Sequence, residues 1–539
     1  MARYQRDRLG TRESHNVPCN LWRRAGNGLL KPEEGKVIQM ALWQSDKPIV
    51  ARKQSNVCKA KGLTGMRWED RDTTPALRGG YGLSTKLSSL TLQARENPKR
   101  RFTSLAHLLT ADFLRGCFKE LKKDKASGID GRTYREYERN LKENLKDLES
   151  RLKGRRYRPK PVRRVYITDT HGKRRPLGIP AIKDKIVQMA IKKILEAIFE
   201  VDFLDVSFGF RPNRGCHDAL DELDRIIMTK PVNFVVDMDI EKFFDSVNHN
   251  WLMECIRQRV VDKSFLRIIE RFLKAGIMEE GKYFDMEKGV PQGAVLSPIL
   301  ANIYLHYILD LWFEREVKKR LKGYAGMVRY ADDFIVCFQA EREAKVFRDM
   351  LRQRLGKFGL RIARDKSRVI EFGRYVWGRA RRTGERLETF DFLGFTHYCD
   401  KTRRGKFKLG RKTSEKRFQR GIKAIWDWLK GIRNRLRLKE WWQMLAIKLI
   451  GHYRYYGISG NMRSLKEFFW LVIKAVYKWI NRRSQKKSGN WEWFKRIIRL
   501  RNPLPKPKIY HPYPILKGCI PEEPNDRIGQ VRFCEGHCS

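Results

Sequence analysis

Three aspartates in this sequence could together hold the metal ions of a catalytic site. Asp332 and Asp333 are adjacent in a predicted hairpin turn, and Asp239 ends a buried strand predicted over residues 232–239. Adjacent carboxylates repel each other and resist burial unless a cation neutralises them. Their oxygens suit Mg²⁺, and three carboxylates could hold two ions about 3.5–4 Å apart, which activates an attacking hydroxyl and stabilises a leaving group. By itself an Asp-Asp pair is usually ordinary turn chemistry, so this hypothesis depends on the surrounding residues.

The three aspartates lie within longer motifs that follow one another along the chain. These motifs are Asp239-Ile240-Glu241-Lys242-Phe243-Phe244-Asp245, Gly289-Val290-Pro291-Gln292-Gly293 with the following Ser297-Pro298-Ile299-Leu300-Ala301-Asn302, and Tyr330-Ala331-Asp332-Asp333. In order and spacing they resemble the signatures of reverse transcriptases. The resemblance implies an RNA-directed DNA polymerase, a nucleotidyltransferase that uses two Mg²⁺ ions.

The resemblance also implies which residues hold the metal ions and the sugar. Asp239, Asp332 and Asp333 would be the catalytic metal ligands. The carbonyl of Ile240 would be a further ligand. Phe244 would lie under the sugar of the incoming nucleotide and collide with a 2′-hydroxyl, which favours deoxynucleotides; the alternative is an ordinary core aromatic residue.

Further nucleotide contacts are implied on either side of the metal ligands. Gln292 would let the chain approach the templating base pair closely. Lys366, after Leu360-Arg361-Ile362, could act as a proton donor near the pyrophosphate, and a plain surface lysine is an equally good interpretation. We interpret Glu241 and Asp245 as non-catalytic.

An upstream hairpin is expected to clamp the triphosphate. Pro161–Ile167 and Lys173–Pro180 resemble the fingers hairpin of the family, in which Arg175 would bind phosphate through two hydrogen bonds. Family members often carry a Pro-Lys pair after the first of these strands, whereas this chain has Thr168-Asp169. Because an Asp cannot bind phosphate directly, Lys173 would supply the second positive charge.

Other patterns narrow the resemblance to the proteins that group II introns encode. They are Gly128-Ile129-Asp130-Gly131, the Pro-Leu-Gly-Ile-Pro run that ends at Pro180, and Ser207-Phe208-Gly209-Phe210-Arg211-Pro212 with His217. This resemblance covers residues 98–505. It implies a reverse transcriptase that is also a maturase, with group II intron RNA, target DNA and dNTPs as its partners, and roles in RNA splicing and retromobility.

Two alternatives remain open at this point. One is a reverse transcriptase of another lineage, for example one that serves antiviral defence. The other is a splicing-only RNA-binding maturase whose polymerase is inactive. The presence of all three aspartates argues against the second alternative, and the aromatic and basic residues after Thr413 argue against the first.

The elements that must position these residues predict an α+β fold. Apolar runs over 232–239, 327–330 and 334–338 predict buried strands, and an apolar stripe from Phe418 to Ile432 predicts a helix. A capping box at Ser464-Leu465-Lys466-Glu467 predicts the start of a later helix. By resemblance we expect a right-hand polymerase with fingers and a ferredoxin-like palm sheet, followed by an α-helical thumb or maturase domain.

The expected domain boundaries follow the same patterns. They are a partly irregular N-terminal extension over 1–97, fingers with an N-terminal reverse-transcriptase extension over 98–230, a palm over 231–400, a helical thumb or maturase domain over 401–505, and a short tail over 506–539 that could be a remnant of a DNA-binding segment.

Charge and aromatic content predict binding to nucleic acid. The chain has 115 Lys and Arg against 62 Asp and Glu, a net charge of +53, and such self-repulsion is tolerable mainly against a polyanion. Stacking surfaces beside phosphate-neutralising charges are typical of RNA-binding segments. The aromatic residues of the helical region include Trp441, Trp442 and Tyr453. We expect half of the aromatic residues in this region to fill its core and not to contact RNA. The predicted RNA-binding residues are Arg163, Arg164, Lys448, His452, Arg454, Tyr455 and Tyr456.

Cysteines and apolar runs indicate the compartment. Ten scattered cysteines fit reduced thiols, and no run approaches the ~20 apolar residues of a membrane span. Because Met1–Asp7 has no signal-peptide core, we expect a cytoplasmic, nucleoid-associated bacterial protein; Asp7 and Glu13 count against an organellar one. Cys519, Cys534 and Cys538 are a poor zinc set, so we expect neither zinc nor an endonuclease domain, and a monomer or homodimer without a membrane partner.

Overall fold

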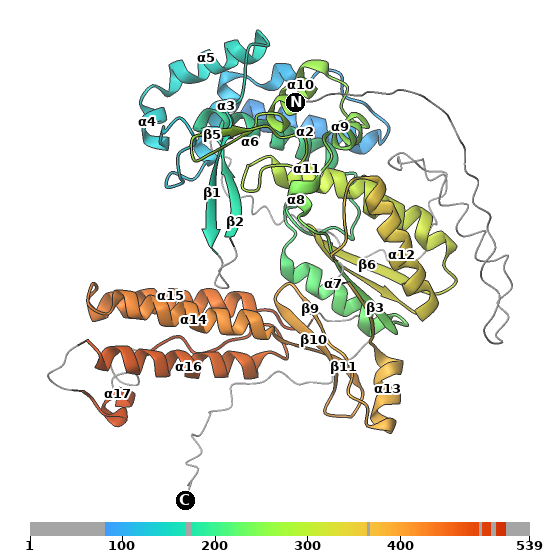
Figure 1. Cartoon of the computed structure of the whole chain (residues 1–539), viewed down its shortest axis with the longest axis vertical. Helices are drawn as coiled ribbons and strands as arrows, with labels where there is room; N and C mark the ends of the chain where they lie inside the picture. Colours follow the sequence, from blue (N-terminus) through green and yellow to red (C-terminus); the bar gives the residue numbers. More distant parts are fainter. Residues whose placement is uncertain (1–80, 169–173, 364–366, 484–487, 497–502, 514–539) are drawn as a thin grey trace, which may run out of the picture. The chain divides into compact units, whose positions relative to one another are not determined.

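The computed structural model describes residues 81–168, 174–363, 367–483, 488–496 and 503–513. All of them belong to one compact unit within residues 47–539 (Figure 1). Lys173, Lys366 and the three C-terminal cysteines lie outside the described residues, as does the extension before Tyr81.

The first helices build one wall of the larger hydrophobic core. Helix α6 is its centre, because apolar residues on all its sides, such as Ile186, Ile191 and Leu195, are fully buried. Thr110 caps α3, and Thr133 with Glu136 forms the capping box of α4, which satisfies backbone donors at these helix starts. The helices are α2 (Tyr81–Glu96), η1 (Ala106–Leu108), α3 (Ala111–Glu120), α4 (Tyr134–Arg139), α5 (Leu141–Lys153) and α6 (Ile182–Phe199).

A sheet with the order β2-β1-β4-β5 projects from these helices (Figure 1). Its strands are β1 (Val162–Thr168), β2 (Arg174–Ile179), β4 (Ile277–Glu279) and β5 (Lys282–Phe284). The predicted turn at Gly128 docks at the base of β2, where a Cβ on Gly128 would lie 2.5 Å from the Ala181 backbone. Only glycine can occupy that position without displacing the hairpin.

The central sheet has the order β6-β7-β3-β8, and all its neighbouring strands are antiparallel. The strands predicted from the apolar runs are confirmed as β3 (Phe234–Asp239), β6 (Ala325–Tyr330) and β7 (Asp333–Phe338), and β8 (Arg368–Glu371) adds an edge. Side chains alternate between the two faces. On one face Val236 and Val336 pack in the core that contains α12 (Glu341–Lys357); on the other, Val235 and Ile335 pack with α7 (Cys216–Thr229).

A second group of helices lies between β3 and β6 in the sequence. Helix α11 continues into two π-helical turns and a 3-10 turn, and all residues from His306 to Asp310 are buried. The elements are α8 (Phe243–Ser246), α9 (His249–Arg257), α10 (Lys263–Leu273), α11 (Ser297–Leu305), η2 (His306–Asp310), η3 (Phe313–Val317) and η4 (Lys318–Arg320).

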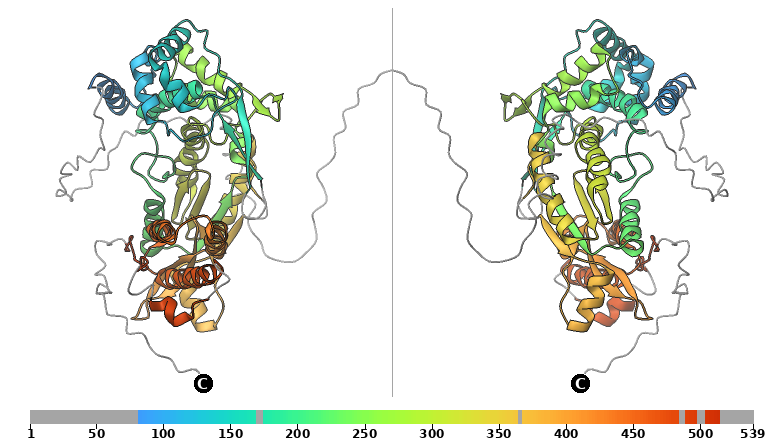
Figure 2. Two further views of the ribbon diagram at one scale, coloured as in Figure 1. Left: turned by 90° about the vertical axis from the view of Figure 1, so that its left-hand side faces the viewer. Right: turned by 90° about the vertical axis from the view of Figure 1, so that its right-hand side faces the viewer.

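The third sheet, with the order β11-β10-β9, precedes a helical bundle. Its apolar residues share a core with one face of the central sheet. Helices α14, α15 and α16 form a separate core and lie next to one another in the side views of Figure 2. The elements are α13 (Arg374–Thr383), β9 (Phe390–Phe392), β10 (Phe395–Lys401), β11 (Phe407–Thr413), α14 (Glu415–Ile432), α15 (Leu438–Tyr456), α16 (Met462–Asn481) and α17 (Trp491–Arg496).

The predicted stripe on α14 is confirmed, and the predicted start of α16 is wrong. Phe418 and Leu429 are buried in the bundle core. Helix α16 begins at Met462, ahead of the supposed capping box at Ser464. The reason is Asn461, which is fully buried; its side chain accepts from the Thr413 backbone N–H and donates to the Thr413 hydroxyl and the Tyr456 carbonyl.

Within the described ranges, no helix is both long enough and apolar enough to cross a membrane.

Candidate active site

The β6–β7 hairpin and strand β3 bring the three aspartates to one end of the central sheet. Asp333 opens β7 and lies directly opposite both Tyr330 on β6 and Asp239 on β3. Ala331, in the tight turn, adopts the left-handed backbone conformation with φ of 59°. The arrangement predicted from the sequence, with carboxylates on neighbouring strand ends, is therefore present in the sheet.

The electrostatics of the turn favour a bound cation. Burial raises the pKa of the Asp332 carboxyl, and the negative charge of Asp239 raises it further. The positive charges of Arg329 and Arg175 lower it. Mg²⁺ takes one or two protein carboxylates and completes its shell with water and substrate phosphates. In the described part of the chain, no group of three or more His, Cys, Asp or Glu side chains is placed to hold a metal.

A buried ion pair fixes the hairpin turn from below. The Arg329 guanidinium donates to Asp310 through Nε (2.7 Å) and Nη2 (2.5 Å), and neither side chain is exposed at all. It also donates to the carbonyl of Ala331 (2.9 Å) and to the hydroxyl of Ser207 (2.7 Å). A buried pair of this kind is tolerated when hydrogen bonds satisfy both charges. Arg329 therefore holds the residue that immediately precedes Asp332.

Sequence reasoning missed this pair. A signal existed, because Asp310 interrupts an apolar helical run and Arg329 interrupts an apolar strand, and charged residues are almost never fully buried unless paired. The sequence alone does not say that these two residues are each other's partners.

The Ser207–Pro212 segment braces the same turn from the side. The Phe208 N–H donates to the Arg329 carbonyl (2.9 Å). Asn302 of α11 donates to the Gly209 carbonyl (2.8 Å). A Cβ on Gly209 would overlap the backbone nitrogen of Ala331, so glycine is required for the segment to reach the turn. The sequence presented this segment only as a family marker; the structure places it against the candidate active site.

Phe244, the residue expected to lie under the nucleotide sugar, is hydrogen-bonded to the loop that carries Gln292. The Val290 N–H donates to the Phe244 carbonyl (2.7 Å). Gly289 has a φ of 89°, and a Cβ there would lie 3.0 Å from the Phe244 carbonyl oxygen. His249 contacts the Gly289 carbonyl through Nε2 (2.7 Å). The Phe244 ring is half-buried and contacts Phe243, with ring centroids 5.3 Å apart.

The other end of that loop is tied to the β1–β2 hairpin. The carbonyl of Gln292 accepts from the Gly178 N–H (2.7 Å). Strand β2 also carries Arg175, which is exposed. These two predicted nucleotide contacts therefore belong to one hydrogen-bonded unit.

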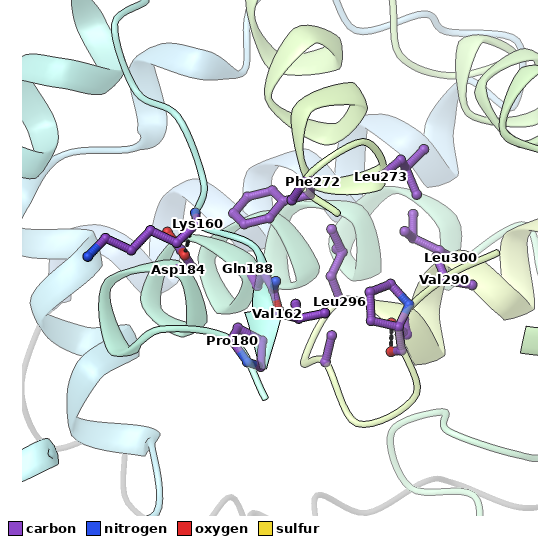
Figure 3. A pocket seen from close by; sticks show the side chains of 14 residues that line it. Lys160, Val162, Pro180, Asp184, Gln188, Phe272, Leu273, Val290, Leu296 and Leu300 are labelled. Atoms are coloured by element: carbon purple, nitrogen blue, oxygen red, sulfur yellow. Dashed lines mark hydrogen bonds between the residues drawn. The ribbon is translucent and has the colours of Figure 1, made fainter. Parts of the chain in front are cut away.

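The cavity under this loop is too small to be a substrate site. It has a volume of about 20 Å³, which is room for roughly one water molecule. Figure 3 shows its lining, in which Val290, Leu296 and Leu300 face Pro180 and Gln188. The Gln188 side chain accepts from the Val295 N–H (3.1 Å), so the cavity belongs to the support of the loop.

The segment before Lys366 lies beside the first aspartate. The Glu241 N–H donates to the Arg361 carbonyl (2.8 Å), and the Ala363 N–H donates to the Asp239 carbonyl (2.9 Å). Ile240 pairs with Ile362 in a short bridge. The sequence motif that precedes Lys366 thus reaches the candidate site, while Lys366 itself lies outside the described residues.

The predicted RNA-binding arginines of β1 already have protein partners. Arg163 donates to the Ser127 carbonyl (2.8 Å). Arg164 forms an ion pair with Glu279 (3.2 Å). Both are half-buried. To contact RNA, each guanidinium would have to donate to the RNA as well as to its protein partner, and the RNA-binding role of both residues stays a prediction.

The predicted RNA-binding residues of α15 divide between core and surface. His452 stacks on Phe468 with ring centroids 3.7 Å apart, and burial lowers the pKa of its imidazole to about 4. Tyr455 donates its hydroxyl to the Leu393 carbonyl (2.9 Å), and Tyr456 is half-buried between two cores. Lys448 and Arg454 are exposed.

Aromatic residues do fill much of the helical core, as expected from the sequence. Trp441, Trp442 and Tyr453 are buried in it. The cations remain at the surface, where Lys448 lies over the ring of Trp428 at 4.9 Å. The RNA-binding role of this region stays a prediction.

Comparison with known proteins defines the class to which this fold and site belong. Residues 159–397, which include all three aspartates, match the family model described as reverse transcriptase (RNA-dependent DNA polymerase). The chain is 34% identical over 273 residues to protein YkfC of Escherichia coli strain K12, which covers 45% of this chain and 71% of that protein.

Two further relatives are named for introns. The chain is 33% identical over 302 residues to the group II intron-encoded protein LtrA of Lactococcus lactis subsp. cremoris, covering 54% of this chain and 50% of LtrA. It is 32% identical over 130 residues to the nuclear intron maturase 4, mitochondrial, of Arabidopsis thaliana, covering 24% and 16%. The chain thus spans about half the length of LtrA. It belongs to the family of reverse transcriptases and maturases encoded by group II introns, and reverse transcriptases generally use divalent metal ions.

Proposed function

We propose that this chain is an RNA-directed DNA polymerase encoded by a group II intron. The observation that carries the proposal is the cross-strand position of Asp239 and Asp333, with Asp332 in the turn beside them. Its substrates would be an RNA template, a DNA primer and dNTPs. Two Mg²⁺ ions, when bound, would lower the pKa of the attacking primer hydroxyl and stabilise the charge on the leaving pyrophosphate.

The chain's own residues would orient the reactants. Asp239, Asp332, Asp333 and the carbonyl of Ile240 would hold the ions, and Arg329 would keep the turn in place. Phe244 would support the sugar.

The two ends of the adjoining loop would bind the rest of the nucleotide. Arg175 would bind the triphosphate from β2, with Lys173 as a second cation. Gln292 would approach the templating base pair, and Lys366 would act near the pyrophosphate. Support comes from the hydrogen bond that joins Gln292 to Gly178 of β2.

We propose that the elements divide as in a right-handed polymerase. Residues 98–230 would form the fingers, 231–400 a palm with a ferredoxin-like sheet, and 401–505 the helical thumb or maturase domain. The antiparallel sheet with helices on both faces and the separate core of α14 to α16 support this division. Residues 1–97 would be an N-terminal extension whose helix α2 packs against α6, and residues 506–539 a short C-terminal tail.

A second role, as the maturase of its own intron RNA, is proposed on the surface chemistry. The net charge of +53 suits a large polyanion, and one relative is named as an intron maturase. The protein would brace the folded RNA through exposed cations such as Lys448 and Arg454 and would meet target DNA during retromobility. It would work as a monomer or homodimer in the cytoplasm, near the nucleoid.

A primer-extension assay tests the polymerase proposal. Wild-type protein should extend a DNA primer on an RNA template, and Asp332→Ala should reduce the rate by at least about a thousand-fold, because a metal ligand is lost. Asp245→Ala, at an exposed carboxylate close in sequence to Asp239, is the matched control and should extend normally. Equal extension by wild type and Asp332→Ala would refute the catalytic assignment.

The maturase proposal needs a separate readout. Asp332→Ala should still promote splicing of the intron RNA, because the RNA carries out that chemistry. A wild-type protein that promotes splicing and never extends a primer would favour the splicing-only alternative.

A further inference from the structure

Phe210 combines a strained backbone with an exposed aromatic ring. Its φ is 59°, in the left-handed region, and the residue is 46% exposed. Bulky residues rarely adopt this conformation because Cβ crowds the backbone. Asn213, three residues later, has a φ of 56°, and asparagine tolerates such a backbone well. The same loop therefore uses a suitable residue at one left-handed position and an unsuitable one at the other.

Burial of the ring does not account for the presence of a phenylalanine at this position. The neighbouring Phe208 packs in the core and is 7% exposed, whereas nearly half of Phe210 faces solvent. Glycine or asparagine would give the same backbone without strain. Strained residues persist where the surrounding structure holds them, and they cluster at active sites and ligand contacts.

The residues on both sides of Phe210 are rigidly held. Asn302 donates to the Gly209 carbonyl (2.8 Å). Arg211 is 8% exposed, and its guanidinium donates to the carbonyls of Leu204 and Ser207, both at 2.8 Å. The backbone cannot relax at Phe210 without breaking these hydrogen bonds, so the direction of its Cα–Cβ bond is fixed in the absence of a ligand.

The position of this ring relates it to the candidate active site. Gly209 packs against the backbone of Ala331 so closely that a Cβ there would overlap it, and Ala331 immediately precedes Asp332. Phe210 is therefore one residue away from the contact with the catalytic turn. An exposed aromatic residue therefore lies on the segment that packs directly against the turn carrying Asp332.

We propose that Phe210 is an apolar surface against which the base edges and sugars of the primer–template duplex pack beside the catalytic aspartates. This inference rests on the proposed polymerase function and adds a binding residue to it. The ring has no hydrogen-bonding group, so it cannot distinguish base identity, and apolar packing is non-directional and therefore tolerant of sequence. The contact is with the duplex and not with the incoming nucleotide.

The test uses variants that distinguish the contribution of the Phe210 ring from that of its backbone conformation. Phe210→Asn keeps the left-handed backbone and removes the ring, while Phe210→Tyr keeps a ring. Tyr375→Asn, at a 65% exposed aromatic residue of α13, is the matched control. Full-length proteins are compared by thermal melting, by fluorescence anisotropy with a labelled DNA primer on RNA template, and by steady-state primer extension.

For Phe210→Asn we expect a melting temperature equal to or above that of wild type and a Kd for primer–template about ten-fold weaker, because the apolar surface that the duplex covers is lost. The KM for primer–template should rise in parallel, and the KM for dNTP should change less than about two-fold. The loss should be equal on duplexes with A·U-rich and G·C-rich primer ends. Phe210→Tyr and Tyr375→Asn should bind like wild type.

Three results would overturn the inference. They are unchanged affinity in Phe210→Asn, a fall in its melting temperature that accompanies weaker binding, and a rise in KM for dNTP alone. The anisotropy measurement does not need catalysis, so the inference can fail while wild-type extension still supports the polymerase, and the reverse can also occur.

Discussion

Among single residues, the buried Arg329–Asp310 pair should affect both the stability of the fold and the position of the catalytic turn. Asp310→Ala leaves a buried guanidinium without its carboxylate, which should lower the free energy of unfolding by about 3–5 kcal/mol. Replacing both partners, as Arg329→Met with Asp310→Leu, should restore part of that stability, because apolar pairs of similar volume are often neutral, while the Ala331 carbonyl and the Ser207 hydroxyl lose their donor. Urea denaturation of the three proteins measures the difference.

The double replacement also separates folding from positioning. It removes the hydrogen bond to the Ala331 carbonyl, so the folded double variant should extend primers at least about ten-fold more slowly, since small misplacements of reacting groups are costly. A double variant that folds and extends at the wild-type rate would show that the pair has no part in placing Asp332.

The residues of the candidate site were predictable to different degrees. Asp239 and Asp332 belong to short motifs whose residue types carry their own chemistry, so the sequence placed them correctly at the end of a strand and in a turn. Asp310 could not be assigned, because its meaning depends on a partner 19 residues away across a π-helical turn. A role for Phe210 could not be predicted either, because neither its backbone angle nor its exposure can be read from its residue type.

At the scale of elements, α15 and α16 contain a group that responds to acid. His452 stacks on Phe468 in the bundle, and burial lowers the pKa of the imidazole to about 4, below its ordinary value of 6.5. Below pH 6.5 the unfolded chain takes up a proton that the folded protein takes up only near pH 4. The bundle should therefore lose stability as the pH falls through this window, by at most about 1.4 kcal/mol per pH unit.

The variant His452→Phe isolates this effect. It keeps an aromatic ring against Phe468 and removes the titrating group, so the difference in unfolding free energy between variant and wild type should grow as the pH falls from 6.5 to 4. Buried carboxyls elsewhere, such as Asp184, are common to both proteins and cancel. A difference that stays constant across this pH range would show that His452 does not titrate in a buried state.

Elements were predicted where local pattern and tertiary packing agree. Phe234–Val236 of β3 and Phe334–Phe338 of β7 are continuous apolar runs because both faces of these strands are covered, and runs of that kind are visible in the sequence. The start of α16 was predicted wrongly because Asn461 is committed to Thr413 of β11. A contact between residues 48 positions apart overrode the local capping signal.

At the scale of the whole molecule, the charge of +53 predicts how RNA binding depends on salt. Each phosphate that a Lys or Arg neutralises releases counterions, so the affinity for intron RNA should fall by at least about a hundred-fold between 50 mM and 200 mM salt. A titration of labelled RNA at several salt concentrations measures the slope. An affinity that barely changes would mean that apolar stacking dominates and that the charge serves another purpose.

The loop from Gly289 to Gly293 links the position of the residue expected under the sugar to the position of the hairpin expected to bind the triphosphate. Its first half is bonded to the carbonyl of Phe244 and its second half to Gly178 of β2. A tilt of the β1–β2 hairpin would therefore be transmitted through the backbone to the residue expected to exclude ribonucleotides. The choice between deoxyribonucleotides and ribonucleotides would then depend on how tightly the triphosphate is bound. Substitutions far from the Phe244 ring would therefore alter which nucleotides are incorporated into the new strand.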